Sequence, residues 1–150
     1  MESLDLKYDV NTELAGRRTG MAFQRTRMAA DRTLMAVIRT SLALISFGFT
    51  IFQFFERLRD QNIISEGSGS ARRFGVTLVA LGIAMLIFGI IYHVQYMIEL
   101  RRLRHSMREE GLVHAETVFP VSLTMITAIL LLAIGVAAIV SMEFHVGPFG

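Results

Sequence analysis

Residues 18–45 read RTGMAFQ RTRMAAD RTLMAVI RTSLALI, four consecutive seven-residue units that each begin with Arg-Thr. Their arginines are Arg18, Arg25, Arg32 and Arg39. Three positions beyond each arginine stands Met, or Leu in the fourth unit, and four positions beyond it stands Ala. Positions spaced by three, four and seven residues share one face of an α-helix. The repeat therefore predicts a helix with a nearly straight stripe of arginines, because a seven-residue period drifts by only about 20° per repeat.

The face opposite the arginines changes from polar to apolar along this helix. It reads Gly20, Gln24, Arg27 and Asp31, and then Leu34, Ile38, Ser41 and Ile45. This change places a water–lipid boundary near residues 31–34, with Arg39 about 7–8 Å of helix rise inside it. From there an arginine can snorkel back to the headgroups, whereas a charge at the bilayer centre costs about 2.5–3.5 kcal/mol and marks a polar interior or a partner. Both interpretations of Arg39 stay open.

Three apolar runs predict three membrane spans, at residues 34–55, 74–98 and 118–142. Each has the roughly 20 residues that a helix needs to cross a hydrocarbon core about 30 Å thick. Backbone groups in lipid must bond within their own segment, and these runs lack the alternation of a barrel strand. We therefore expect an all-α membrane protein, with a three-helix transmembrane domain (residues 34–150) and a cytoplasmic, amphipathic, helical N-terminal extension (residues 1–33).

The distribution of lysine and arginine predicts the orientation. The arm before the first span has six such residues and the connector at 99–117 has four, whereas the connector at 56–73 has four. Because cytoplasmic flanks carry the excess of Lys and Arg, we expect a cytoplasmic N-terminus and an outward C-terminus in a bacterial inner membrane. Residues 1–19 lack the apolar run of a signal peptide, so the first helix is expected to stay in the mature protein.

The composition argues against several classes of function. Hydrophobic residues make up 53% of the chain, and cysteine is absent, which excludes disulfides, iron–sulfur clusters and thiolate zinc sites. A formal charge of +2, with basic and acidic residues interleaved, does not suggest nucleic-acid binding. We also expect no enzyme activity, cofactor or metal, since catalytic motifs are missing and the histidines lack ligand spacing. The histidines are His93, His105, His114 and His145, expected to be interfacial or solvated.

Small residues in the second and third spans predict close helix packing. Gly75, Gly82 and Gly89 are seven residues apart, and Ala128 and Gly135 repeat that spacing. Membrane helices approach each other most closely at such small residues, and a heptad of them suits left-handed packing.

Residues 31–49, DRTLMAVIRTSLALISFGF, resemble the YidH-like family of small bacterial inner-membrane proteins, which have three spans and no known function. The family's membrane domain is similar to that of the eukaryotic vacuolar transporter chaperone complex, which makes polyphosphate and passes it through an oligomeric, basic channel. The resemblance implies that Arg25 and Arg32 are channel-lining residues and that Asp31 is their acidic neighbour. The chain departs from that complex by lacking Lys and Arg in its second and third spans and the usual aromatics at Leu34 and Val37.

Two hypotheses follow for the arginine stripe. In the first, the protein is a homo-oligomer whose arginines line a vestibule or conduit for phosphate-type anions or polyphosphate, with Asp31 as a charge partner. In the second, it is a membrane scaffold or accessory subunit whose arginines bind anionic lipid headgroups or a partner protein. The lipid bilayer is the environment in both.

Overall fold

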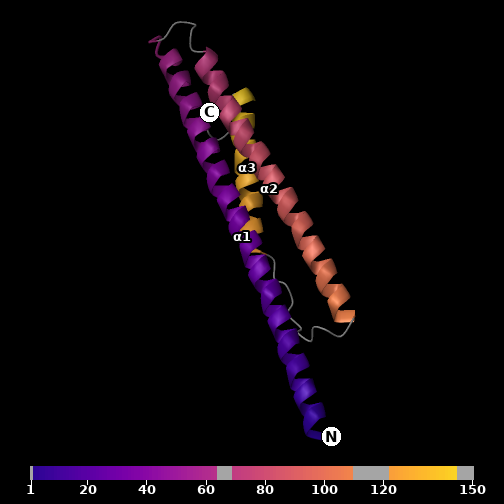
Figure 1. The fold of residues 1–150 in the computed structure, drawn as a ribbon. Coiled ribbons are helices and arrows are strands. Elements are labelled where there is room, and N and C mark those ends of the chain that lie inside the picture. The colour runs from indigo at the N-terminus through magenta and orange to yellow at the C-terminus, as the bar shows by residue number, and fades with distance from the viewer. Residues whose placement is uncertain (1, 64–68, 110–121, 145–150) are drawn as a thin grey trace. The chain divides into compact units, whose positions relative to one another are not determined.

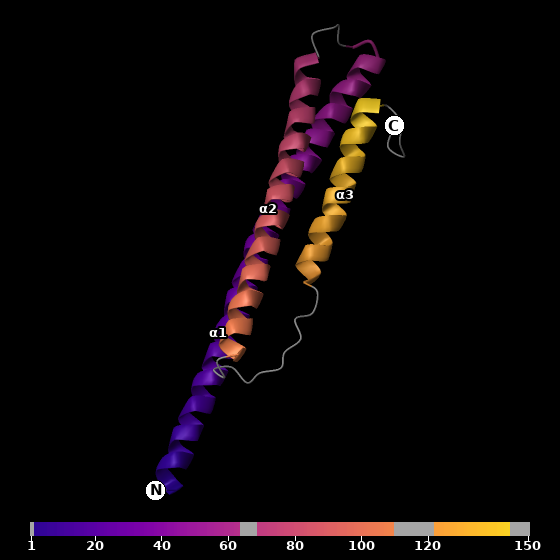
Figure 2. The same cartoon turned by 90° about the vertical axis from the view of Figure 1, so that its right-hand side faces the viewer.

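The computed structural model describes residues 2–63, 69–109 and 122–144, and within them the only regular elements are three α-helices. These are α1 (Glu2–Asp60), α2 (Gly69–Glu109) and α3 (Leu123–Phe144) (Figure 1, Figure 2). Each contains a stretch that is long and apolar enough to cross a membrane, within Val10–Asp60, Gly69–Met107 and Leu123–Met142. The prediction of an all-α fold with three such helices is confirmed.

The first helix is continuous from the N-terminal arm into the first predicted span. It ends in a Schellman motif, in which the Ile63 N–H donates to the Leu58 carbonyl at 3.1 Å and the Asn62 N–H to the Arg59 carbonyl at 2.9 Å. Asn62 has φ 56°, the left-handed conformation that asparagine tolerates better than most residues. The helix therefore stops about one turn beyond the predicted end of the span.

The third helix starts later than the predicted span. Residues 118–121 lie outside the described residues, Ser122 is not helical, and α3 begins at Leu123. Ser122 thus occupies the position before the first helical residue, where serine is strongly favoured. α2, in contrast, is helical well past residue 98, to Glu109.

The chain forms two compact units. The hairpin unit comprises residues 1–33 and 92–122, and the bundle unit comprises residues 34–91 and 123–150. In the hairpin unit the N-terminal arm packs on the second half of α2, with Phe23 and Leu100 buried. The unit boundaries within α1 and α2 fall at residues 33–34 and 91–92, which in α1 matches the point where its sequence becomes apolar.

The core of the bundle unit joins segments of all three helices, which lie side by side in Figure 1 and Figure 2. Every third or fourth residue of α1 from Leu34 to Phe52 is buried, as a heptad seam requires. The two apolar clusters consist of Leu34, Ile38, Leu86, Ala128 and Leu131, and of Ile45, Phe52, Val79 and Met142.

The glycines of α2 lie where α1 comes closest. A Cβ on Gly75 would lie 2.7 Å from the carbonyl oxygen of Gly48, and added Cβ atoms on Gly82 and Gly89 would lie 2.8 Å and 2.6 Å from side chains of α1. Those side chains are Ile45 and Val37, respectively. In α3, Ala128 is fully buried, and a Cβ on Gly135 would lie 3.1 Å from both Ile45 and Ile83. All five predicted packing residues therefore lie at helix contacts of the bundle unit.

Candidate functional site

The arginines of the repeat in the hairpin unit lie on the outer face of α1. Arg18, Arg25 and Arg32 are all exposed, and Met21 and Met28 between them are each 53% exposed. A shallow depression of about 500 Å³ runs along this face, lined by Arg18, Met21, Ala22, Arg25 and Thr26. No other described part of the unit covers these side chains. The guanidinium groups are therefore accessible to a ligand.

The threonines of the repeat use their hydroxyls inside the helix. Each donates a hydrogen bond to the carbonyl oxygen four residues earlier, at 3.0–3.1 Å. The four donors are Thr19, Thr26, Thr33 and Thr40. A ligand on this face would consequently meet arginine as the available donor, because the neighbouring hydroxyl protons are already engaged.

In the bundle unit the same heptad positions of α1 remain small or polar. Arg39 is exposed. The residues that follow it on the same face of the helix, at alternating steps of four and three residues, are also small or polar. They are Ala43, Ser46, Thr50, Gln53 and Arg57, of which all but the half-buried Gln53 are exposed. Large apolar side chains are exposed on all three helices of the unit, such as Phe47 at 60%, Phe88 at 71% and Ile134 at 60%. The small and polar positions therefore form a narrow strip on α1, bordered by the exposed apolar side chains of Leu42 and Phe54.

A polar cluster in the hairpin unit brings together Asp31, His93 and Ser122. The Ser122 hydroxyl donates a hydrogen bond of 2.8 Å to Asp31 Oδ1, and His93 Nε2 lies 3.6 Å from the same oxygen. The second distance is within reach of an ion pair if the ring is protonated, but it is too long for a hydrogen bond. Asp31, predicted as a charge partner of the arginines, thus has contacts with a histidine and a serine.

His93 was not selected from the sequence, where it was expected to be interfacial or solvated. It is 3% exposed, so of the two expectations the solvated side chain does not hold for His93, and the interfacial one stays a prediction. The sequence did contain a signal: His93 follows Gly89 by four residues and therefore continues the face of α2 that carries the glycine heptad. Ser122 gives no comparable signal, because the sequence places it among the first residues of the predicted third span.

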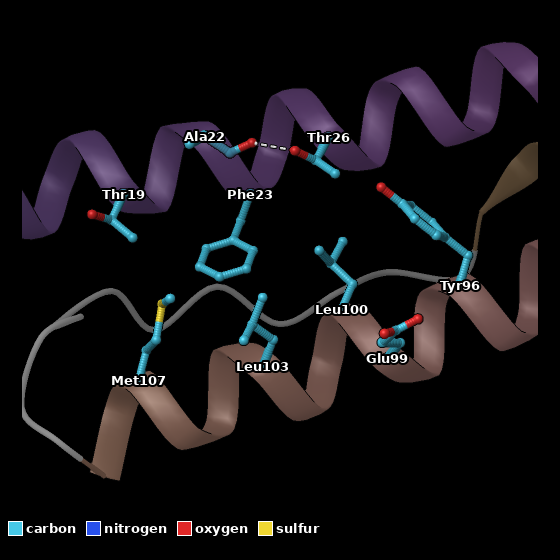
Figure 3. Close-up of a pocket in the computed structure, with 9 residues that line it drawn as sticks. All are labelled: Thr19, Ala22, Phe23, Thr26, Tyr96, Glu99, Leu100, Leu103 and Met107. Atoms are coloured by element: carbon cyan, nitrogen blue, oxygen red, sulfur yellow. Dashed lines mark hydrogen bonds between the residues drawn. The ribbon is translucent and has the colours of Figure 1, made fainter.

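A second depression in the hairpin unit, of about 450 Å³, lies between α1 and α2 (Figure 3). Figure 3 shows Phe23 of α1 pointing toward Leu100 and Leu103 of α2, with Tyr96 and Glu99 farther along the groove. Its lining is mainly apolar and its charged residue is a carboxylate, which would repel an anion. This groove does not fit the ligand suggested by the arginines.

Metal ligands are not clustered in the described part of the chain. Among residues 2–63, 69–109 and 122–144, no group of three or more His, Cys, Asp or Glu side chains could hold a metal ion. Asp31 and His93 lie close together, but they are only two of the three side chains that such a group requires.

A protein-family model matches part of the chain. Residues 25–99, half of the chain, match the protein family described as Domain of unknown function (DUF202). The matched region begins at the second arginine of the repeat and includes Asp31, His93 and the glycine heptad. No curated protein and no solved structure matches the chain.

Proposed function

Because the chain belongs to the family described as Domain of unknown function (DUF202), whose description names no activity, we propose its function from the side chains of α1. The protein is a homo-oligomeric membrane protein that presents an arginine-lined binding vestibule or conduit to phosphate-type anions. The arginines are Arg18, Arg25, Arg32 and Arg39. The protein is not an enzyme in this proposal, and the arginine face is its functional surface.

The exposure of all four arginines at one heptad position is the observation that supports this function. Guanidinium groups only donate hydrogen bonds, and their planar fork matches phosphate oxygens in a bidentate arrangement. Successive arginines are separated by seven residues, or about 10–11 Å of helix rise. This spacing exceeds the size of a single phosphate. A compact anion would therefore need arginines from several chains, whereas a polyphosphate could contact several along one chain.

The small and polar face after Arg39 supports association with further copies of the chain. Small residues and hydroxyl or amide groups promote helix pairing in membranes. Ser46 can both donate and accept a hydrogen bond, whereas the Thr50 hydroxyl donates to the Ser46 carbonyl at 2.8 Å and offers a second copy only its oxygen as an acceptor. Arginine lacks an acceptor and repels its copies, so the segment from Arg18 to Arg39 needs an anion between the chains.

Cysteine scanning tests which face of α1 meets the second copy, and the chain contains no native cysteine that would interfere. We expect Ala43→Cys, Ser46→Cys and Thr50→Cys to form disulfide-linked dimers in membranes under mild oxidation. Phe88→Cys and Ile134→Cys are the controls, because both positions are exposed on other helices. Equal or stronger crosslinking of the controls would show that α1 does not form the interface.

Native mass spectrometry of the protein in nanodiscs, with and without added polyphosphate, tests the function directly. A defined oligomer that retains polyphosphate is the expected result. A monomer that carries only anionic lipid would contradict it and would favour the second function, a scaffold whose arginines bind headgroups or a partner protein. The choice of polyphosphate as the probe comes from the resemblance of residues 31–49 to the YidH-like family, and through it to the vacuolar transporter chaperone complex.

The proposed location is the bacterial inner membrane, with the N-terminus in the cytoplasm and the C-terminus outside. The proposal depends on the ten Lys and Arg residues flanking the spans on the first side, six in the arm and four in the second connector, against four on the other side. In this orientation the exposed arginines of the hairpin unit face cytoplasmic anions. Labelling single cysteines at Gly20 and Gln61 with an impermeant maleimide in intact cells is expected to modify only the second.

A further inference from the structure

Three segments of the hairpin unit meet at one carboxylate oxygen. Asp31 of α1 accepts the hydrogen bond of Ser122, which precedes α3, and faces His93 of α2. Ser122 and Asp31 are 91 residues apart in the chain, so their contact ties distant segments together. A hydroxyl that donates to an ionised carboxylate forms a stronger bond than one between neutral groups. His93, at 3% exposed, forms the buried side of the cluster.

The contact has the wrong connectivity for nucleophilic catalysis. A serine nucleophile needs the imidazole as its base, with the carboxylate on the far side of the ring. Here the Ser122 hydroxyl donates to Asp31, and the carboxylate lies between the hydroxyl and the ring. The arrangement holds segments together and does not activate Ser122.

The contact also orients the Asp31 carboxylate toward His93 and Ser122. Asp31 precedes Arg32, and consecutive residues of a helix point about 100° apart. The side chain of Asp31 is 27% exposed and turns toward His93 and Ser122, whereas Arg32 is exposed on the outer face. Loss of the Ser122 donor would leave a carboxylate free to move toward the arginine face.

We propose that Asp31, His93 and Ser122 form a clasp that holds the Ser122 segment against α1 and α2 within the hairpin unit and keeps the Asp31 carboxylate away from the arginine face. Opening the clasp lowers the affinity for anions, since Asp31 then competes with them for the arginines. This regulatory role rests on the proposed anion binding, while the mechanical role of the clasp does not.

A double-substitution cycle tests the regulatory role, with tripolyphosphate binding to the full-length protein in nanodiscs as the measurement. Ser122→Ala is expected to weaken binding about two- to fivefold, the range of an exposed ion pair. Asp31→Asn, which removes the charge and keeps an acceptor oxygen, is expected to restore the affinity of Ser122→Ala to within about twofold of the unmodified protein. Thr33→Val is the matched control, because its hydroxyl bonds only within α1, to the Ala29 carbonyl.

Failure of the rescue would overturn the regulatory role, because a purely structural defect is not repaired by removing the Asp31 charge. Hydrogen exchange of the peptide that contains Ser122 tests the mechanical role separately. It should become faster in Ser122→Ala and stay unchanged in Thr33→Val. If the unmodified protein binds no tripolyphosphate, the proposed function and the regulatory role both fail, but faster exchange still supports the mechanical clasp. Unchanged exchange in Ser122→Ala would overturn the clasp itself.

Discussion

Gly75→Ala is expected to destabilise the bundle unit by about 1–3 kcal/mol, the usual cost of overpacking a tight contact. The added Cβ would lie 2.7 Å from the Gly48 carbonyl oxygen and 3.1 Å from the backbone nitrogen of Phe52. Both atoms belong to the backbone of α1, so they cannot move aside as a flexible side chain would. The two helices must separate to accept a single methyl group.

The contact is reciprocal, since a Cβ on Gly48 would lie 2.6 Å from the Gly75 carbonyl oxygen. Gly48→Ala should therefore have a similar effect. Circular dichroism during titration with denaturing detergent would measure the stability. Gly20→Ala is the control: nothing lies within 4 Å of its added Cβ, so the substitution should stabilise α1 by about 0.5–1 kcal/mol. Equal stability of Gly75→Ala and the unmodified protein would contradict the close approach of the helices.

The helices could be predicted from the sequence because each signal was local and periodic. The apolar runs have the length of a membrane span, and the arginine repeat continues the same helical period through the N-terminal arm. The position of the α2 glycines was also readable, since small residues seven apart share a face. Both signals depend on spacing within one segment, which is what helical geometry determines.

The polar cluster could not be predicted because it joins residues from three separate segments. The resemblance implies Asp31 as the acidic neighbour of the arginines, but its contacts with His93 and Ser122 depend on how the hairpin unit packs. Periodicity shows which face of a helix a residue occupies, not which residue of another helix lies opposite. The start of α3 illustrates the same difficulty, since the apolar run begins before the helix does.

The two sides of α1 in the bundle unit differ in burial. Leu34, Ile38 and Ile45 on one side pack within the bundle unit, while Arg39 and Ser46 on the other side remain exposed. A helix that only anchored the chain in lipid would need apolar residues on its outer side, because exposed polar groups in a bilayer are costly. The outer side of α1 also exposes Leu42, Phe47 and Phe54, which suit lipid, so its small and polar residues form only a narrow strip, the one that the proposed function assigns to further copies.

Arg25→Ala combined with Arg32→Ala is expected to weaken tripolyphosphate binding by about 100-fold. Hydrogen bonds between charged groups contribute about 1.5–3 kcal/mol each, and about 1.4 kcal/mol corresponds to a factor of ten. Isothermal titration calorimetry in nanodiscs would measure the affinity. The combination Arg101→Ala and Arg102→Ala is the matched control, since it removes the same charge from exposed positions of α2 in the same unit.

Lysine at the same two positions separates geometry from charge. Arg25→Lys with Arg32→Lys keeps both positive charges but loses the planar fork that binds two phosphate oxygens at once. We expect this variant to bind with an affinity between those of the unmodified protein and the alanine variant. If the control on α2 weakens binding as much as the alanine variant does, the protein attracts anions through its overall charge. The arginine face of α1 would then be no more than one part of a diffuse positive surface.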